Sequence, residues 1–236
     1  TGPSVLGWAD QAALDIILNP NNPEPVILIN PDEEISKAYE NRFPGVFSNK
    51  IGKLKDFTHE IILKENAVPV MHKARNIPLT IREEVSQELV KLENDNIIEK
   101  IESSDWVAPI VVAKRPNGKI RLCVDLRDLN NNIFIDQFPL PKINELLSVT
   151  KDKQWFSTID LKSAYHQITL HPSSKRLTAF ITPFGCYQFV RVPFGLASAA
   201  AMFQRLMFHL FHELKGVTFF QDDILIMGKT RTEHDE

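Results

Sequence analysis

Two adjacent carboxylates, Asp222 and Asp223, are the residues of this sequence best placed to do chemistry. Hydrophobic stretches flank them, with VTFF before and ILIM after Gln221-Asp222-Asp223. Two neighbouring carboxylates in apolar surroundings repel each other and lose hydration, so one must take a proton unless a cation neutralises the pair. A divalent metal ion would remove that cost. A polar hairpin turn would also place two acids between strands, and the pair alone does not decide between these interpretations.

Asp160 is the candidate for a third acid, because it too stands at the end of an apolar stretch, WFSTID. Adjacent residues of a strand face opposite ways, so only one of Asp222 and Asp223 easily shares a metal with a distant acid. Three carboxylates that converge from two strand ends meet the requirement of two-magnesium phosphoryl transfer. One ion lowers the pKa of an attacking hydroxyl, and the other holds the triphosphate and its leaving oxygen. The predicted cofactor is therefore two Mg²⁺ ions, with Mn²⁺ as a substitute.

The elements that must position these acids alternate irregularly along the chain, which predicts an α+β fold rather than a doubly wound parallel sheet. A helix is expected from Thr80, with Thr80-x-x-Glu83 as a capping box, to about residues 94–96. Two further helices are expected, a short one with Ile143, Leu146 and Leu147, and one that Ser198 caps and whose apolar face is Phe203, Leu206, Met207, Leu210, Phe211 and Leu214. Strands are predicted at residues 107–113, 120–124, 155–160, 179–182, 186–190, 217–220 and 224–227.

Basic residues cluster in one segment, although the net charge of the whole chain is negative. The net charge is −3, yet residues 110–131 hold five bases against two acids, whereas residues 1–50 hold three bases against seven acids. Pro116-Asn117-Gly118 predicts a tight turn that sets Lys114 and Arg115 across from Lys119 and Arg121. Local clustering of this kind attracts phosphate.

The composition is that of a globular protein and argues against a membrane-spanning or disulfide-rich one. With 236 residues, 43% of them hydrophobic, the chain has room for one large or two small domains with a real core. No apolar run reaches the ~18 residues that a membrane helix needs, and no signal peptide is visible at the start. Two cysteines, Cys123 and Cys186, are too few for a disulfide framework and are expected to be reduced.

Six motifs then fit one family in order: WVAPIVVAKRPNGKIRLCVDLRDLN (106–130), FPLPKI (138–143), FSTIDLKSAYHQI (156–168), TAFITPFGCYQF (178–189), VPFGLASAAAMFQ (192–204) and FFQDDILI (219–226). From about Phe43 to its last residue the chain resembles reverse transcriptases of the Ty3/gypsy class of long-terminal-repeat retrotransposons. The resemblance implies a right-hand polymerase fold, with fingers and a ferredoxin-like palm that carries the acids, and an RNA-directed DNA polymerase that adds dNTPs to a primer 3′-hydroxyl.

The resemblance also implies roles for individual residues. Asp160, Asp222 and Asp223 match the metal-binding and catalytic triad, with Asp223 nearer the primer end. The matched residues of the dNTP site are Arg115, Arg121, Tyr165, Phe194 and Gly195. Fixed cations in such a site neutralise charge that builds during transfer, and a bulky ring at Tyr165 leaves no room for a ribose 2′-hydroxyl. The template and primer contacts are expected at Lys114, Lys119, Gln204 and Gln221.

Some positions depart from the family pattern. Phe220 replaces a usual tyrosine before the acids, Gln221 fills a variable position beside the primer, and Ala199-Ala200 replaces a usual Ala-Pro. The ending is the larger departure, because Glu236 lies thirteen residues past Asp223 and the thumb is expected to be absent. This leaves a second interpretation, a truncated or host-adopted remnant that binds nucleic acid without catalysis. An RNA-dependent RNA polymerase is a third class, against which Tyr165 argues.

The expected organisation has three parts. Residues 1–50, which begin TGPSVLGWADQ, resemble the end of a retropepsin followed by a linker, although no protease triplet is present. Residues 51–154 are expected to form the fingers with the palm entry, and residues 155–236 the palm. The resemblance implies as partners a primed RNA or DNA template, dNTPs, and the remainder of the Pol polyprotein with its thumb, RNase H and integrase. It also implies a cytoplasmic virus-like particle; no membrane partner is expected.

Overall fold

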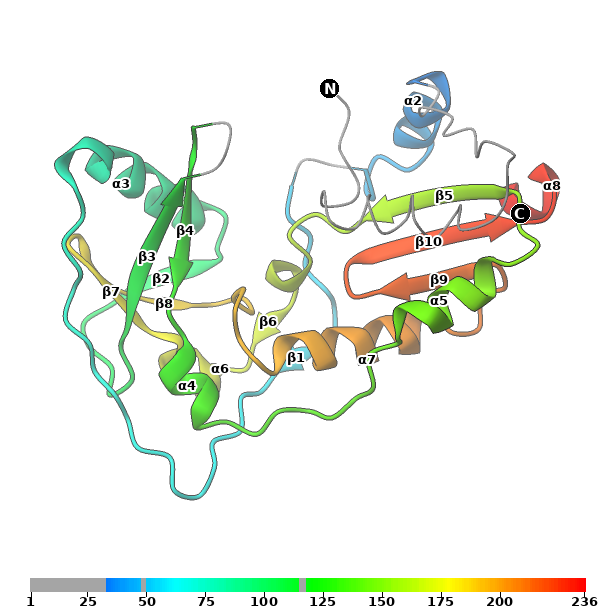
Figure 1. Ribbon diagram of the computed structural model, residues 1–236. Coiled ribbons are helices and arrows are strands. Elements are labelled where there is room, and N and C mark those ends of the chain that lie inside the picture. Colours follow the sequence, from blue (N-terminus) through cyan, green and yellow to red (C-terminus); the bar gives the residue numbers. More distant parts are fainter. Residues whose placement is uncertain (1–32, 48–49, 115–117) are drawn as a thin grey trace. The chain divides into compact units, whose positions relative to one another are not determined.

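The computed structural model describes residues 33–47, 50–114 and 118–236, and Figure 1 shows their secondary structure. The chain divides into two units, each built from separated segments. Unit 1 comprises Thr1–Ile51, Pro141–Lys162 and Leu210–Glu236, and unit 2 comprises Gly52–Leu140 and Ser163–His209. The fold is α+β, as the sequence predicts. The predicted boundaries of fingers and palm, and the retropepsin-like start, stay predictions; residues 1–32 lie outside the described part.

Unit 2 is organised around a five-stranded sheet with the order β2-β8-β7-β3-β4. Its strands are β2 (Ile98–Ile101), β3 (Ala108–Lys114), β4 (Ile120–Val124), β7 (Phe180–Thr182) and β8 (Gly185–Phe189). All its pairs are antiparallel except β3 with β7. The strands predicted at residues 107–113 and 120–124, and at 179–182 and 186–190, are confirmed and form antiparallel pairs, because alternating hydrophobic residues are a local signal. Pro116 and Asn117 of the predicted tight turn lie outside the described residues.

Unit 2 contains further helices and two short strands besides this sheet. They are β1 (Thr58–His59), α3 (Leu79–Asn94), α4 (Arg127–Asn131), the 3₁₀ helices at Ala164–Gln167 and Arg176–Thr178, β6 (Thr169–Leu170) and α6 (Pro172–Lys175). Strand β1 pairs with β6 in parallel. The helix predicted from Thr80 is confirmed as α3, but its capping box is wrong. The N-cap is Pro78, which has no side-chain cap, so Thr80 lies inside the first turn.

The core of unit 2 combines one face of α3 with aromatic residues of the sheet. Val85 and Leu89 of α3 are 0% and 1% exposed. Phe180, also 0% exposed, packs with its ring centroid 5.7 Å from that of Tyr187 and 5.3 Å from that of Phe189. Burying a side chain of this size contributes about 1.5–3 kcal/mol. The packing of these rings therefore stabilises β7 against β8. The segments that come after β8 in the sequence start from this position.

Unit 1 contains the three-stranded antiparallel sheet β5-β10-β9. Its strands are β5 (Trp155–Asp160), β9 (Val217–Phe220) and β10 (Asp223–Gly228), accompanied by α2 (Glu33–Arg42), α5 (Ile143–Thr150) and α8 (Arg231–Asp235). Figure 1 shows β10 lying between the two other strands. The predicted strand at residues 155–160 and the hairpin with acids at its tip are confirmed.

A glycine sets the start of the β9–β10 hairpin. Gly216 has a φ of +71°, and a Cβ atom there would lie 2.5 Å from the carbonyl oxygen of Met227. The Met227 amide donates a 2.7 Å hydrogen bond to the Gly216 carbonyl. Only glycine allows both this backbone conformation and so close an approach. The hairpin register, and with it the place of the acids, is fixed at this end.

Helix α7 (Ala199–Phe211) corrects part of the predicted apolar face. Phe203 and Met207 are buried at 3% and 1% exposure, as expected, but Leu210 and Leu214 are each 52% exposed. Leu214 lies beyond the end of the helix, so helical spacing no longer governs the direction of its side chain. The predicted helix with Ile143 is confirmed as α5, where the Glu145 carboxylate accepts a hydrogen bond from the Lys142 amide.

Two further features of the structure concern membrane helices and the two cysteines. In residues 33–47, 50–114 and 118–236, no helix combines the length and the apolar character needed to cross a membrane. Cys123 and Cys186 are not bonded to each other, and Cys186 is buried.

Candidate functional site

The tip of the β9–β10 hairpin presents Asp222 and Asp223 at one end of the unit 1 sheet. Phe220 and Asp223 are cross-strand partners, so the loop between the strands has only two residues, Gln221 and Asp222. Gln221 has a φ of +53°, in the left-handed region that non-glycine residues seldom adopt. Strain of this kind persists where the surrounding structure imposes it, and it is enriched at functional sites.

Asp160 lies at the same end of the sheet. It is the direct partner of Asp223 across the β5–β10 ladder, and directly opposite residues of an antiparallel pair project to the same face. The amide of Leu161, the residue after Asp160, donates a 3.1 Å hydrogen bond to the carbonyl oxygen of Asp222. The hairpin tip therefore lies beside the end of β5. The three acids predicted from the sequence are found at the same end of the sheet.

The electrostatics of this edge connect Asp160 with Asp222. The pKa of Asp160 is raised above its ordinary value, first because burial removes hydration and then because the negative charge of Asp222 is near. A carboxylate whose ionisation a neighbouring carboxylate disfavours suits a divalent cation, which stabilises the charged form. Among the described residues, no set of three or more His, Cys, Asp or Glu side chains is arranged to hold a metal ion. The geometry thus supports an acidic pair, and the three-acid metal site stays a prediction.

The aromatic residues of the predicted dNTP site form a cluster in unit 2. The Tyr165 ring lies edge-on to Phe194, with centroids 5.3 Å apart, and to Phe203, with centroids 5.4 Å apart. Phe194 is 40% exposed and Phe203 is 3% exposed. Tyr165 therefore packs between an exposed ring and a buried one. Gly195 is exposed, has a φ of +85°, and has open space where a Cβ atom would lie.

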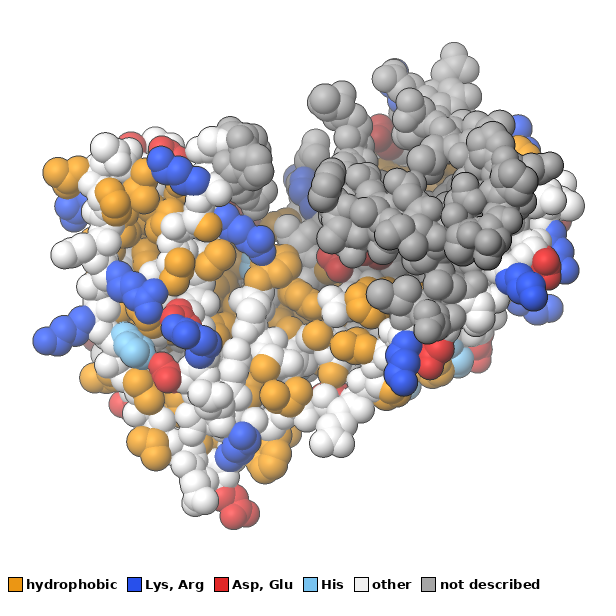
Figure 2. All heavy atoms as spheres, in the orientation of Figure 1, with side chains coloured by type: hydrophobic (Ala, Val, Ile, Leu, Met, Phe, Trp, Pro, Cys, Tyr) orange, Lys and Arg blue, Asp and Glu red, His pale blue; other side chains and the backbone are white. Residues whose placement is uncertain are grey.

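The predicted cations lie on the exposed β3–β4 ribbon, and its register corrects their arrangement. Lys114 is opposite Ile120 and Arg121 is opposite Ala113, so Lys114 and Arg121 project from opposite faces. Both are exposed, as is Lys119, and Figure 2 shows Lys and Arg side chains spread over the visible face of this unit. Arg115 lies outside the described residues. The predicted contacts of these cations with a nucleotide or a template stay predictions.

Gln204, predicted to lie beneath the template strand, is only 3% exposed. Its side chain therefore has little surface to offer a template, whereas Gln221 at the hairpin tip is half-buried. Both contacts stay predictions.

Sequence reasoning missed the polar side chains that hold the segment carrying Phe194 and Gly195. Asn130, His59 and His166 each hydrogen-bond to that segment or to its ends. Asn130 ends the motif VDLRDLN, but nothing in its spacing marks it as a partner of residues more than sixty positions away. His166 is 9% exposed.

His166 makes the stability of unit 2 depend on pH. Burial is the largest cause that lowers its pKa, to about 4, and the charge of Arg191 also lowers it, while the hydrogen bond to the Val192 carbonyl raises it. From pH 6.5 down to about 4 the unfolded chain binds a proton that the folded chain does not, so stability falls as the pH falls through this window and no further below it. The full loss is roughly 3 kcal/mol.

We therefore expect the destabilisation caused by His166→Gln to shrink by about 2–3 kcal/mol between pH 7.5 and pH 4.5, because the variant has no buried imidazole to keep neutral. Denaturant unfolding of both proteins at the two pH values measures this difference. His209→Gln, at an exposed position, is the control and should show no such change. An equal destabilisation by His166→Gln at both pH values would contradict the prediction.

Comparison with solved structures shows which fold the chain adopts. The fold matches the fingers and palm region of a prototype foamy virus protease-reverse transcriptase mutant, with a TM-score of 0.77 and 20% sequence identity over 98% of this chain and 31% of that one. At 20% identity this likeness shows that the chain shares the fold of that region.

The family follows from the sequence matches. Residues 112–236, more than half of the chain, match the model of the reverse transcriptase (RNA-dependent DNA polymerase) family. The chain is 34% identical over 180 residues to the retrovirus-related Pol polyprotein from transposon 412 of Drosophila melanogaster, and 32% identical over 173 residues to that from transposon gypsy. These matches cover 73% and 70% of this chain. The chain belongs to the reverse transcriptase family and is related to Ty3/gypsy Pol polyproteins. It spans only 14% and 17% of the length of these two relatives.

Proposed function

We propose that this chain forms the fingers and most of the palm of an RNA-directed DNA polymerase that adds dNTPs to a primer 3′-hydroxyl. One observation carries the proposal: Asp160 and Asp223 face each other across β5 and β10, and Asp222 at the hairpin tip is near enough to raise the pKa of Asp160. Membership of the reverse transcriptase family supports the reaction. The foamy viral protease-reverse transcriptase has been solved with an RNA/DNA hybrid, which supports a primed template as the partner.

In this proposal Asp160, Asp222 and Asp223 hold two Mg²⁺ ions, with Asp160 and Asp222 as the main ligands and Asp223 nearer the primer end. Carboxylate oxygens are the ligands that Mg²⁺ prefers, and the mutual repulsion of Asp160 and Asp222 fits a site completed by a cation. When bound, the ions lower the pKa of the primer hydroxyl and neutralise charge on the triphosphate. The contribution of the chain is to fix Asp222 and Asp223 on a short, constrained hairpin, with Asp160 beside them at the end of β5.

The incoming nucleotide is proposed to contact unit 2. Arg115 and Arg121 neutralise the triphosphate, as fixed cations do in phosphoryl transfer. The ring of Tyr165 packs under the deoxyribose and excludes a 2′-hydroxyl, while Phe194 and Gly195 line the pocket. Template and primer contacts are assigned to Lys114, Lys119, Gln204 and Gln221, of which the two lysines are exposed on the β3–β4 ribbon.

The organisation that accompanies this function has residues 51–154 as fingers and residues 155–236 as palm, after a retropepsin-like segment at residues 1–50. The thumb, RNase H and integrase are proposed to belong to the remainder of the Pol polyprotein. Clamping of the duplex would come from the thumb, so the intact polyprotein product is the material for any measurement of activity.

The proposal is tested by primer extension with the intact protein that contains this chain. We expect dNTP addition on both RNA and DNA templates, abolished by EDTA and restored by Mg²⁺, because the carboxylates need the ions to bind the triphosphate. Control reactions omit the primer or contain a primer with a 3′-deoxy end. Nucleic-acid binding without any extension, on either template and with Mg²⁺ or Mn²⁺, would contradict the proposal.

A further inference from the structure

The segment from Val192 to Ser198, which contains Phe194 and Gly195, is held at both ends by histidine side chains. His166 donates a 3.1 Å hydrogen bond from Nδ1 to the carbonyl oxygen of Val192. At the other end, Nε2 of His59 lies 2.9 Å from Oγ of Ser198. Both histidines are buried, and burial lowers the pKa of each. The two ends of the segment are therefore fixed by neutral, desolvated groups from other parts of unit 2.

Asn130 holds the middle of the same segment. Its Nδ2 donates a 2.8 Å hydrogen bond to the carbonyl oxygen of Gly195, and its Oδ1 accepts a 2.8 Å hydrogen bond from the amide of Ala197. One planar amide thus uses both a donor and an acceptor on a stretch of three residues. Gly195 itself is exposed and in a left-handed conformation.

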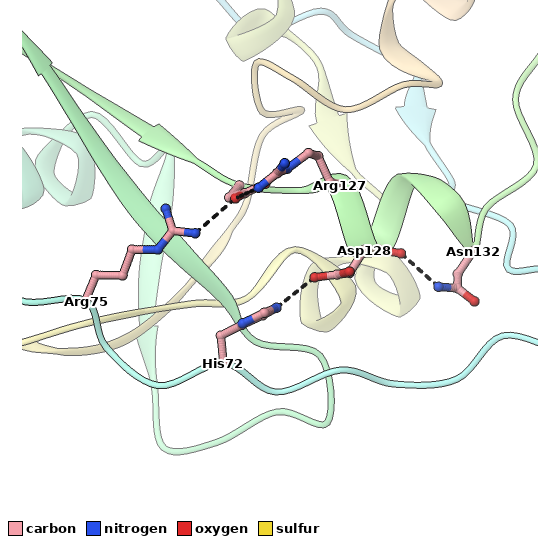
Figure 3. A network of polar contacts seen from close by, with 6 residues as sticks. His72, Arg75, Arg127, Asp128 and Asn132 are labelled. Atoms are coloured by element: carbon pink, nitrogen blue, oxygen red, sulfur yellow. Dashed lines mark hydrogen bonds and ion pairs between the residues drawn. The ribbon is translucent and has the colours of Figure 1, made fainter.

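Polar contacts hold helix α4, which carries Asn130. The helix thereby supports the Asn130 clamp, that is, the two hydrogen bonds from the Asn130 side chain to Gly195 and Ala197. Figure 3 shows the polar contacts around α4, in which His72 pairs with Asp128 at 2.7 Å and the side-chain amide of Asn132 donates to the Asp128 carbonyl. Arg127 and Arg75 both bind the Asp125 carboxylate. Hydrogen bonds from Arg127 are the largest cause that holds the pKa of Asp125 far below its ordinary value, so this carboxylate stays charged and paired.

The clamp reaches the aromatic cluster through Phe194. The ring of Phe194 lies edge-on to His166, with centroids 4.8 Å apart, and to Tyr165, with centroids 5.3 Å apart. Because Phe194 directly precedes Gly195, the backbone that Asn130 fixes also fixes the position of the Phe194 ring. A shift of that backbone would remove the support that the Phe194 ring gives to Tyr165. The position of the Tyr165 ring therefore depends on Asn130, with Phe194 in between.

We infer that Asn130 is a positioning residue for the nucleotide pocket: its double hydrogen bond to Gly195 and Ala197 holds Phe194 against Tyr165 and so sets how tightly the site binds dNTPs and rejects rNTPs. The inference rests on the proposed polymerase function, and it adds a residue that does not itself touch the nucleotide. Binding should suffer more than chemistry, because the carboxylates that hold the metal ions are on other elements, β5 and the β9–β10 hairpin.

The test compares Asn130→Ala with Asn131→Ala in the intact protein. Asn131 is the neighbour in α4 and is exposed, so it matches residue type and helix position without the clamp. For Asn130→Ala we expect the KM for dNTPs to rise about tenfold, kcat to change less than about twofold, and the preference for dNTPs over rNTPs to fall. Hydrogen exchange of the Ala197 amide should accelerate, since its acceptor is gone. Asn131→Ala should behave as wild type in all four measurements.

Asn130→Asp keeps the size of the side chain and serves if the alanine variant does not fold. It retains an acceptor for the Ala197 amide but has no N–H for the Gly195 carbonyl, so KM and discrimination should shift in the same direction while Ala197 stays protected. If wild type extends primers but both Asn130 variants keep its KM and discrimination, the inference is overturned and the polymerase function stands. If wild type does not extend primers at all, both fail.

Discussion

Asp222→Asn is expected to lower the rate of primer extension by about a thousandfold or more without reducing the stability of the protein. Asparagine keeps the shape of the side chain but removes the charge that the proposed metal site needs. In a phosphoryl-transfer site the ions supply most of the stabilisation of developing charge, so losing one ligand has a large effect. Stability should not fall, because the substitution removes one of two neighbouring negative charges at the sheet edge.

Single-turnover primer extension across a range of Mg²⁺ concentrations, together with thermal unfolding, measures both parts of this prediction. Asp152→Asn is a matched control, since it removes one negative charge from an exposed position in the same unit. Its φ of +65° is one that asparagine tolerates. Extension by Asp222→Asn at the wild-type rate would rule out the role given to that acid. Loss of activity together with loss of stability would indicate a structural role instead.

Tyr165→Val is expected to reduce the preference for dNTPs over rNTPs by about a hundredfold. The Tyr165 ring is held edge-on by Phe194 and Phe203, and a ring held in this way cannot move aside for a 2′-hydroxyl. Valine leaves space where the ring was, so the ribose of an rNTP should fit. The effect should appear mainly as a higher kcat/KM for rNTPs, because space is created and the site for dNTPs is otherwise retained.

The measurement is the ratio of kcat/KM for each dNTP to that for the matching rNTP. Tyr165→Phe is the control that separates the ring from its hydroxyl, and it should keep the wild-type ratio. An unchanged ratio in Tyr165→Val would show that another group excludes the 2′-hydroxyl. Tyr165→Val differs from Asn130→Ala in one useful respect, because only the asparagine substitution is expected to expose the Ala197 amide to exchange.

Local patterns in the sequence were sufficient for the elements that carry the acids. The strand at residues 155–160 and the hairpin around Gln221-Asp222-Asp223 were predicted correctly, since hydrophobic alternation and turn residues depend on neighbours along the chain. The turn is one residue shorter than predicted, because Asp223 already belongs to β10. The family was also predicted from ordered motifs and is confirmed by the family match. The errors are local as well: Thr80 is inside α3 rather than at its cap, and Leu210 is exposed although it keeps helical spacing.

What the sequence by itself determined is therefore the family, the α+β class, and the acids Asp160, Asp222 and Asp223 as candidates. Only the tertiary structure decided that Asp160 is opposite Asp223 while Asp222 shifts its pKa, that Lys114 and Arg121 face opposite ways, and that Asn130 clamps Gly195. The physical reason is the same in each case. Strand register and hydrogen bonds from side chains to distant backbone atoms depend on how separated segments pack, and they leave no periodic signal in the sequence.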